Sequence, residues 1–400
     1  MKRVLVFVVS LIFASVVFAQ QPVEYLLKAK SLTDGGKAKD AILLLTDGLS
    51  KTQDSRLYIL RAEAFMTIGD YSGAINDYQS ANKFAEGAGE YGLSRIYALK
   101  GDVKTSLYHL DLNLASSHKR GEREIMLDPA FSVIENTPDW RQFWKKERYN
   151  IFEKKIPEIE YYISTGNREE ATALLNELTS QYPDDNSTRY ASALVDFSLK
   201  KYTEAIGILT GLESIDKKNE TWLRLLARVQ SASGNVAGAS VTYSQLIDLG
   251  TADAMLYLDR AECFRKTGEL DKAVKDLSFF TQLYPDNKSA LGLLGKVESE
   301  SGDNLKALDY FSQNLKLHPN DPQCYIDRAN SYFVSRTWDY AIKDYSMALD
   351  IQPSDGEVWL NKGIALLNMG RTEDACHDFR KALSLGNKKA APYISRSCIK

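Results

Sequence analysis

Small apolar residues recur at a fixed interval along most of this chain. Seven alanines stand 34 residues apart without a slip, and a large apolar residue follows each by four positions. Four positions are about one helical turn, so each pair shares a helix face. A period of this kind predicts an array of helical repeats. The alanines are Ala171, Ala205, Ala239, Ala273, Ala307, Ala341 and Ala375, and their followers are Leu175, Leu209, Tyr243, Leu277, Phe311, Tyr345 and Phe379.

Turn-forming residues occupy fixed places between the apolar positions. Glycine stands five residues before five of the seven alanines, which suits the left-handed residue that ends a helix. Proline stands twelve residues after four of them, where it would stop a second helix. A second small residue, alanine or glycine, lies twelve residues before six of them and would let two helices approach closely. Each period therefore predicts one pair of packed helices.

These positions resemble the tetratricopeptide repeat. The resemblance implies an all-α fold, a right-handed superhelical α-solenoid of stacked helix pairs with a C-terminal capping helix. It is weaker around Ala205, where Lys200 and Lys217 hold the glycine and proline positions, and Arg336 replaces the glycine before Ala341. One of the best matching periods carries Tyr257, Leu258, Asp259, Arg260, Ala261, Phe264, Gly268, Ala273, Leu277 and Pro285, and another carries Tyr325, Ile326, Asp327, Arg328, Ala329, Tyr332, Ala341, Tyr345 and Pro353.

We expect about ten repeats in two groups. Three looser repeats fill residues 22–115, and seven regular repeats fill residues 151–387. The intervening residues 116–150 are rich in aromatic side chains and resemble the segment that closes a group of tetratricopeptide repeats in many bacterial proteins. Residues 388–400 predict a single capping helix. Because Pro157 lies in the helix that follows the joint, we expect a kink or a break near residue 156.

Residues 1–19 differ in composition from the rest of the chain. Lys2 and Arg3 precede an apolar run that ends at Phe18-Ala19, the pattern of a secretory signal peptide. The alternative is an uncleaved anchor, but the run is shorter than the roughly 20 residues that a bilayer span needs. The pattern favours export. We expect the protein in the periplasm or at the periplasmic face of the outer membrane, and secretion is the alternative. After cleavage we expect no integral membrane segment.

A eukaryotic secretory lumen is the competing compartment for an exported chain. Asn186, Asn219 and Asn287 each begin an Asn-x-Ser/Thr triplet, which would be a glycosylation acceptor there.

The overall charge argues against nucleic acid as a partner. The formal net charge is −3, with 50 basic and 53 acidic residues, and no basic block lies within the repeats. Nucleic-acid binding needs a basic footprint of that kind.

Two of the four cysteines predict a disulfide. Cys376 and Cys398 each stand 11 residues from Asn387, where an antiparallel helix pair would turn. Equal distances from a turn bring two residues side by side, so an exported chain could join the capping helix to the last repeat. The alternative is a pair of buried thiols. Cys263 and Cys324 lie two repeats apart, too far for a bond.

No motif predicts catalysis, a metal site or a cofactor. The four histidines, His109, His118, His318 and His377, lack the spacing of a metal site, and the glycines form no phosphate-binding loop. Acidic pairs such as Glu169-Glu170 stand where helices begin. We therefore expect a protein that is not an enzyme.

The resemblance also implies a binding groove. In the family, the second, fifth, ninth and twelfth residues of each repeat face the concave side. These residues would hold a partner peptide or helix, which predicts a protein-interaction scaffold in the cell envelope. Two alternatives stay open: the apolar members pack only against neighbouring helices, or the two groups hinge as a regulatory or sensory module. The groove positions are Tyr190, Phe197, Arg224, Arg228, Leu258, Glu262, Arg265, Ile326, Asn330, Phe333, Leu360 and Ile364.

Overall fold

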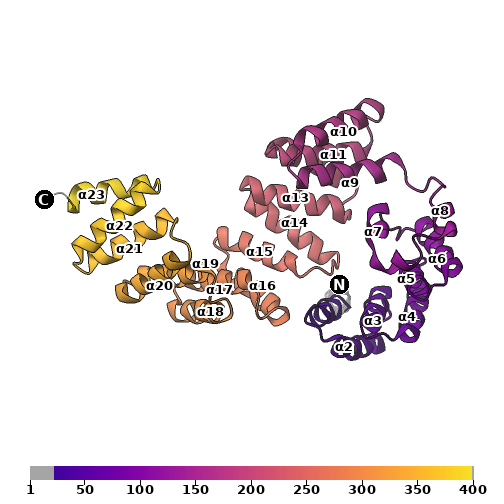
Figure 1. The fold of residues 1–400 in the computed structure, drawn as a ribbon, viewed down its shortest axis with the longest axis horizontal. Coiled ribbons are helices and arrows are strands. Elements are labelled where there is room, and N and C mark those ends of the chain that lie inside the picture. The colour runs from indigo at the N-terminus through magenta and orange to yellow at the C-terminus, as the bar shows by residue number, and fades with distance from the viewer. Residues whose placement is uncertain (1–21, 399–400) are drawn as a thin grey trace, which may run out of the picture. The chain divides into compact units, whose positions relative to one another are not determined.

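All regular structure in residues 22–398, the part that the computed structural model describes, is helical (Figure 1). The predicted all-α solenoid fold is confirmed. The signal peptide predicted for residues 1–19 lies outside the described residues. The chain divides into two compact units, residues 1–256 (unit 1) and 257–400 (unit 2).

Unit 1 holds six helix pairs and one irregular insertion in its described residues. The first pair is a helix over residues 22–34 with α2, and each later pair takes two consecutive helices. The insertion consists of α7, η1 and α8. The helices are α2 (Ala38–Lys51), α3 (Ser55–Thr67), α4 (Tyr71–Phe84), α5 (Glu90–Leu99), α6 (Val103–Ala115), α7 (Glu122–Leu127), η1 (Pro129–Val133), α8 (Pro138–Phe143), α9 (Ile151–Ser164), α10 (Arg168–Gln181), α11 (Asn186–Ser198), α12 (Tyr202–Ile215), α13 (Glu220–Ser233) and α14 (Val236–Asp248).

Four further pairs and a cap make up the described part of unit 2. The first helix, α15, begins two residues before the boundary between the units. Together with unit 1 this gives ten pairs within residues 22–398, as the period predicts. The helices are α15 (Met255–Lys266), α16 (Leu270–Leu283), α17 (Lys288–Ser301), α18 (Asn304–Leu317), α19 (Pro322–Val334), α20 (Trp338–Ile351), α21 (Gly356–Asn368), α22 (Thr372–Ser384), η2 (Lys388–Ala390) and α23 (Ala391–Ser397).

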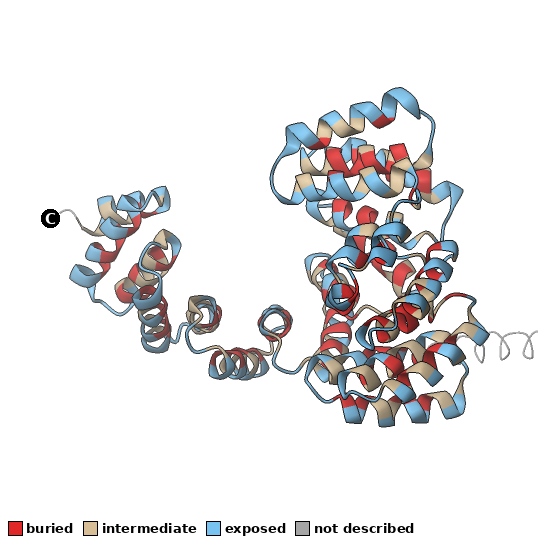
Figure 2. Ribbon diagram, turned by 45° about the vertical axis from the view of Figure 1, so that its right-hand side comes forward, coloured by how far each residue is buried: buried red, intermediate tan, exposed pale blue. Residues whose placement is uncertain are grey.

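The periodic alanines lie where the helices of a pair meet. All seven are fully buried, and the buried residues shown red in Figure 2 follow the seams between helices. The small residue of one helix faces the large apolar residue of the next. A Cβ atom on Gly295 would come within 2.4 Å of the Phe311 ring, and one on Gly363 within 2.7 Å of the Phe379 ring. The regular spacing of small and large residues therefore reflects the packing of the first helix of each pair against the second.

The turns within the pairs need a left-handed residue. Glycine supplies it at Gly234 and Gly302, with φ values of 85° and 91°. Lys200 and Arg336 stand at the same place in their repeats and take φ values of 61° and 58°. The turn keeps its shape there, and a side chain accepts a conformation that favours glycine.

A buried ion pair recurs within four of the helix pairs. A basic residue on the first helix meets an aspartate 16 residues later on the second. The arginine pairs are bidentate, as where Arg328 donates from Nε and Nη2 to Asp344 at 2.7 and 2.8 Å. Arg61 also donates to Thr46 of the preceding repeat at 2.9 Å, so one guanidinium holds three helices. The pairs are Arg61 with Asp77, Arg260 with Asp276, Arg328 with Asp344, and Lys362 with Asp378.

The insertion at residues 116–150 covers the end of α5 and α6. Phe131 and Trp140 are buried with their ring centroids 5.3 Å apart, in a core that includes Leu110 of α6. Asp128, before the proline of η1, accepts hydrogen bonds from the Tyr91 hydroxyl at 2.7 Å and the Ala130 amide at 2.9 Å. The insertion therefore packs as part of unit 1.

The break expected near residue 156 does not occur. Helix α9 runs without a break from Ile151 to Ser164 with Pro157 inside it. The chain changes direction earlier, between α8 and α9, and Asn150 starts the new helix with a capping box to Glu153. Pro157 stands in the second turn of α9, after the capping box that begins the helix.

Unit 1 also closes on itself. The Arg56 guanidinium of α3 donates to the Gly250 carbonyl, which follows α14, at 2.8 Å, although 194 residues separate them. Ala252 packs against the core formed by the helix of residues 22–34 with α2 and α3. In Figure 1 these first helices, in indigo, lie beside the end of α14. No periodic pattern predicts this contact.

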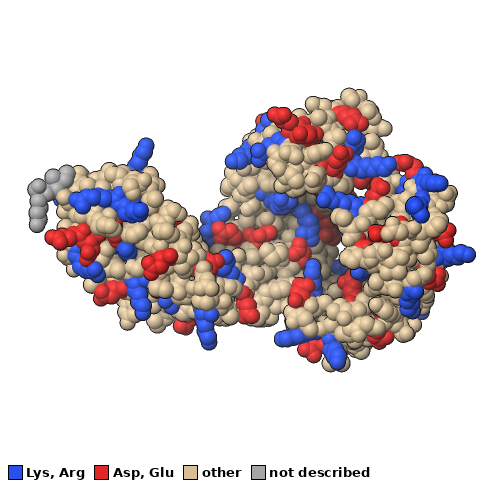
Figure 3. Space-filling model, viewed as in Figure 1, with Lys and Arg blue, Asp and Glu red and all other residues tan. Residues whose placement is uncertain are grey.

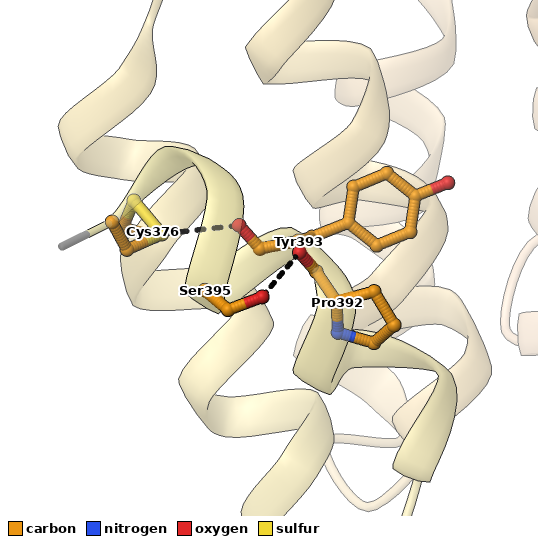
Figure 4. Close-up of a disulfide and its surroundings, with 5 residues drawn as sticks. Cys376, Pro392, Tyr393 and Ser395 are labelled. Carbon is orange, nitrogen blue, oxygen red and sulfur yellow. Dashed lines mark hydrogen bonds between the residues drawn. A yellow bond between two sulfur atoms is a disulfide. The ribbon is translucent and has the colours of Figure 1, made fainter.

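The capping helix α23 is joined to α22. The structure links Cys376 and Cys398 through their Sγ atoms at 1.99 Å, with 5.5 Å between the Cα atoms (Figure 4). The Tyr393 ring stacks on the buried Phe379 ring, with centroids 5.0 Å apart. The cap therefore covers the apolar end of the last repeat.

Candidate partner-binding groove

A hollow of about 350 Å³ lies in unit 2 against the first helices of three successive repeats. We call it the Gly292 hollow, after the residue on its middle helix. Glu262 and Arg265 of α15 line it with Leu258, so three of the predicted groove residues meet at one site. The lining residues are Leu258, Asp259, Glu262, Arg265, Lys288, Ser289, Gly292, Leu293, Lys296, Asn314, Gln323, Cys324 and Asp327.

Arginine 265 is fixed between two carboxylates at the α15 side of the hollow. Its Nε and Nη2 each donate to Glu262 at 2.9 Å, and its Nη1 donates to Glu300 of α17 at 2.5 Å. Burial would raise the pKa of Glu262, but the hydrogen bonds and charges of Arg265 and Lys266 outweigh it and lower the pKa. Both groups are therefore ionised at neutral pH.

The opposite side of the hollow holds buried hydrogen-bonding groups. Asp327 of α19 accepts from Gln323 at 2.8 Å and lies 3.3 Å from Lys296. Asn314 of α18 donates through Nδ2 to the Lys288 carbonyl at 3.0 Å. Its Oδ1 is buried and has no hydrogen-bond partner among the described residues. An acceptor in that state carries an energetic cost for the folded protein.

A second hollow, of about 140 Å³, adjoins the first one and shares Lys296 and Asp327 with it. The predicted groove residue Asn330 lines this second hollow, and its Oδ1 accepts from the Tyr345 hydroxyl at 2.7 Å. Ser331 lines it too, with a buried hydroxyl that has no partner among the described residues. The polar groove thus continues along α19.

Cysteine 324 borders the hollow but is unsuited to nucleophilic chemistry. Burial, followed by the charges of Asp321 and Asp327, raises the pKa of its thiol to about 11. The thiol is therefore protonated at neutral pH and a weak nucleophile. Cys263, two repeats away as the sequence shows, is buried as well.

The remaining predicted residues of unit 2 serve packing. Ile326 and Phe333 pack against the buried core around Tyr345. Leu360 is 3% exposed and lies in the core around Phe379, with Ile364 packed against it. The apolar C-terminal end expected for the groove is therefore largely taken up by contacts between helices.

The predicted residues of unit 1 gather on α11 and α13. Tyr190 is buried, and burial raises its pKa to about 12. The Arg228 guanidinium lies 5.6 Å from the centroid of the Phe197 ring, and Arg224 donates to Asp253 at 2.7 Å. Figure 3 shows basic and acidic side chains together around a hollow in this unit.

Sequence reasoning missed the centre of the site. Gly292 stands at the fifth position of its repeat, a groove position, and leaves the gap by lacking a side chain. That glycine is the signal that could have located the hollow. Asn314 comes from a second helix, which the groove rule does not consider.

The described residues contain neither a cluster placed to bind a metal ion nor a helix suited to crossing a membrane. Within residues 22–398, no group of three or more His, Cys, Asp or Glu side chains is placed to hold a metal ion. No helix in the same range is long and apolar enough to cross a membrane.

Comparisons with known proteins agree on the repeat. Residues 356–388, which contain α21 and α22, match the family model described as a tetratricopeptide repeat. The chain is 31% identical over 149 residues to a DnaJ homolog subfamily C member 7 homolog of Schizosaccharomyces pombe, covering 32% of this chain and 30% of that relative. It is 24% identical over 226 residues to Hsp70-Hsp90 organizing protein 2 of Arabidopsis thaliana, covering 53% of this chain and 38% of that relative. The chain thus aligns with less than half the length of either relative.

A solved structure shows the same architecture. A tetratricopeptide repeat protein from Parabacteroides merdae superposes with a TM-score of 0.51 over 62% of this chain and 99% of that chain, at 19% identity. This likeness concerns the fold. The family match at residues 356–388, the 34-residue period and the ten helix pairs of the described residues agree on the tetratricopeptide repeat.

Proposed function

We propose that the protein is a non-enzymatic scaffold that holds a segment of a partner protein along the first helices of its repeats. The observation that carries this proposal is the Gly292 hollow, where three successive first helices present charged and polar side chains to one cavity. A protein segment supplies both hydrogen-bond donors and side chains to such a surface. The Arabidopsis relative is named as an organizer of two other proteins, which is a role of the same class.

The hollow suits recognition better than catalysis. Its arginine is held by two carboxylates, its thiol is protonated, and its charged groups face one another in pairs. Figure 3 shows acidic and basic side chains interspersed on unit 2. Such a surface favours a partner with matched polar groups.

The proposed place of action is the cell envelope. The apolar run in residues 1–19 and the linked pair Cys376 and Cys398 both suit an exported protein, since disulfides persist in oxidising compartments. Mass spectrometry of the protein from its native cells tests this point. We expect a mature chain that begins at Gln20, and a chain that retains residues 1–19 would contradict export by cleavage.

Position-specific crosslinking tests the scaffold role. A photoreactive phenylalanine analogue replaces Ser289, which is exposed at the hollow, in the full chain in its native cells. The control replaces Leu305, which is 79% exposed on α18. We expect one discrete crosslinked product from position 289 and none from position 305. Equal products at both positions, or none at either, would contradict binding in this groove.

A regulatory module that bends is the second candidate. The observation that favours it is the division of the chain at residue 256. The sequence places the hinge at residues 116–150 instead, but those residues share a core with α5 and α6. Small-angle scattering with and without a crosslinked partner would distinguish the candidates, because an unchanged profile argues against bending.

A further inference from the structure

We propose that the disulfide between Cys376 and Cys398 is a redox latch on the capping helix α23, opened when a thiol attacks the Cys398 sulfur. This reaction is separate from the scaffold role and belongs to the cap alone. The class of reactant is a thiol or a dithiol, and the result is the release of α23 from the last repeat.

Helix α23 is attached to its neighbours by few contacts. Within residues 22–398, no hydrogen bond or ion pair made by a side chain joins α23 to another element. The contacts that hold it are the disulfide to α22, the stacking of Tyr393 on Phe379, and the packing of Ile394 against the same core. Figure 4 shows the disulfide and the Tyr393 ring on different sides of α23. The disulfide is therefore the strongest tie in this described contact.

The segment η2, directly before α23, is held by polar contacts instead. Asn387 donates through Nδ2 to the Gly356 carbonyl at 3.1 Å and to the Glu357 carboxylate at 2.7 Å. Lys389 pairs with Glu357 at 3.1 Å, and Ala390 is fully buried. These contacts tie η2 to the start of α21 and do not involve sulfur. Breaking the disulfide therefore frees α23 and leaves η2 in place.

A released α23 does not keep its helical shape. It has seven residues, and isolated helices shorter than about 12–15 residues are marginal in water. Opening the bond also removes the loop closure that restrains this segment. The Phe379 ring, which is fully buried in the closed form, then loses the cover of Tyr393. The expected product is a mobile C-terminal segment beside an uncovered apolar ring.

Exposure directs the attack to Cys398. Cys376 is 6% exposed on α22, whereas Cys398 is half-buried at the end of α23. Because a thiolate must reach the sulfur that it attacks, the more accessible cysteine is the site of exchange. Cys263 and Cys324 are buried thiols and are poor sites for the same reagent.

The exchange balances with a thiol as the reactant. The sulfur of the attacking thiolate bonds to the Cys398 sulfur, and the bond between the two cysteine sulfurs breaks. The electron pair of that bond stays on Cys376, which takes up a proton and packs as a small apolar thiol. A second thiol then releases Cys398 and forms a disulfide with the first. The cysteine pair gains two electrons, and the two attacking thiols lose them.

Limited proteolysis of the full mature chain tests the release of α23. Trypsin cuts after Arg396 in α23 and after Arg380 in α22, and both residues are exposed. We expect dithiothreitol to quicken the cut after Arg396 by about tenfold or more, since a disulfide contributes more than the roughly 1.4 kcal/mol that corresponds to tenfold. The cut after Arg380 should change far less. In Cys376→Ser, Cys398→Ser the cut after Arg396 should be fast with or without dithiothreitol.

Glutathione identifies the sulfur that is attacked. The oxidised protein is treated briefly with reduced glutathione and then quenched with acid and N-ethylmaleimide, and peptide mass spectrometry locates both groups. We expect glutathione on Cys398 and the maleimide on Cys376, because exchange at Cys398 leaves the Cys376 thiol behind.

Several outcomes overturn the latch. If reduction leaves the cut after Arg396 unchanged, apolar contacts alone hold α23. If the cuts after Arg396 and Arg380 quicken equally, the bond supports the whole repeat and not the cap. Glutathione on Cys376, or equally on both cysteines, contradicts the assigned site. Reaction of both thiols with N-ethylmaleimide before any reduction means that there is no bond to open.

Discussion

At the scale of single residues, backbone conformation at the turns is the clearest place where this chain departs from its repeat. Lys200 and Arg336 take the left-handed conformation that glycine provides in other repeats. An L-residue with a side chain pays roughly 1–2 kcal/mol for that conformation. Both residues are exposed, and each amide donates to a carbonyl three residues earlier at 3.0 Å. The repeat therefore tolerates the cost of the left-handed conformation, because the packing of its two helices keeps the turn in place.

We expect Arg336→Gly to stabilise unit 2 by about 1 kcal/mol, because glycine takes the left-handed conformation without strain. Thermal unfolding followed by circular dichroism measures the change. Arg336→Ala is the control, since alanine removes the side chain and keeps the Cβ atom that causes the strain. An equal gain in both variants would mean that the arginine side chain, and not the backbone, limits stability.

At the scale of elements, the 16-residue ion pair shows how a helix pair is held together. Three of the four pairs use arginine, whose fork makes two parallel hydrogen bonds to aspartate. The fourth uses Lys362, which lies 3.3 Å from Asp378. Burial raises the pKa of Asp378, and the nearby charge of Lys362 only partly offsets that effect.

We expect Lys362→Arg to stabilise the last repeat by about 1 kcal/mol at neutral pH, through a second charge-assisted hydrogen bond. Folding raises the pKa of the Asp378 carboxyl above its unfolded pKa of 3.8. The folded protein therefore loses stability as the pH rises above 3.8. The variant should lessen that loss. Melting temperatures between pH 4 and pH 7 measure it, and the gain should grow toward neutral pH. A gain that is the same at every pH would exclude the ionisation of Asp378 as its cause.

The cap is the second element whose stability can be predicted. In the oxidised protein the link between Cys376 and Cys398 closes a 22-residue loop, which stabilises the folded cap by roughly 3 kcal/mol. We expect a reducing agent to lower the melting temperature of the unchanged protein. The double variant Cys376→Ser, Cys398→Ser should melt at the lower temperature in either condition. If both thiols of the exported protein can be alkylated without reduction, the link is absent in the cell.

Sequence reasoning succeeded where a contact repeats and failed where it occurs once. The alanines and their apolar followers recur, so the helix pairs and their packing could be derived from the period. The Gly292 hollow depends on one missing side chain and on Asn314 of a second helix. The contact of Arg56 with Gly250 joins residues 194 positions apart, and no local preference encodes it.

At the scale of the whole molecule, the closure of unit 1 distinguishes it from an open array of repeats. Its two ends are joined by the hydrogen bond from Arg56 to Gly250 and by an apolar contact at Ala252. The helix of residues 22–34 would otherwise leave its core at the end of the array, where terminal repeats need cover. The loop after α14 supplies that cover.

We expect Arg56→Glu to loosen this closure, because the variant loses the donor to Gly250 and adds a negative charge near Glu220. Hydrogen exchange of the full chain should quicken in residues 22–34 and around Gly250, by roughly tenfold for a loss near 1.4 kcal/mol. Arg380→Glu, an exposed charge reversal on α22, is the control. Equal acceleration in both variants would point to a general loss of stability.

Closure also limits how this protein can change its length. An open solenoid can gain or lose a repeat by duplication or deletion, because each repeat touches only its neighbours. In unit 1 such an event would shift Arg56 away from Gly250 and expose the core of the first helix pair. The number of repeats in unit 1 is therefore fixed by its geometry, as the number of strands is fixed in a closed β-barrel.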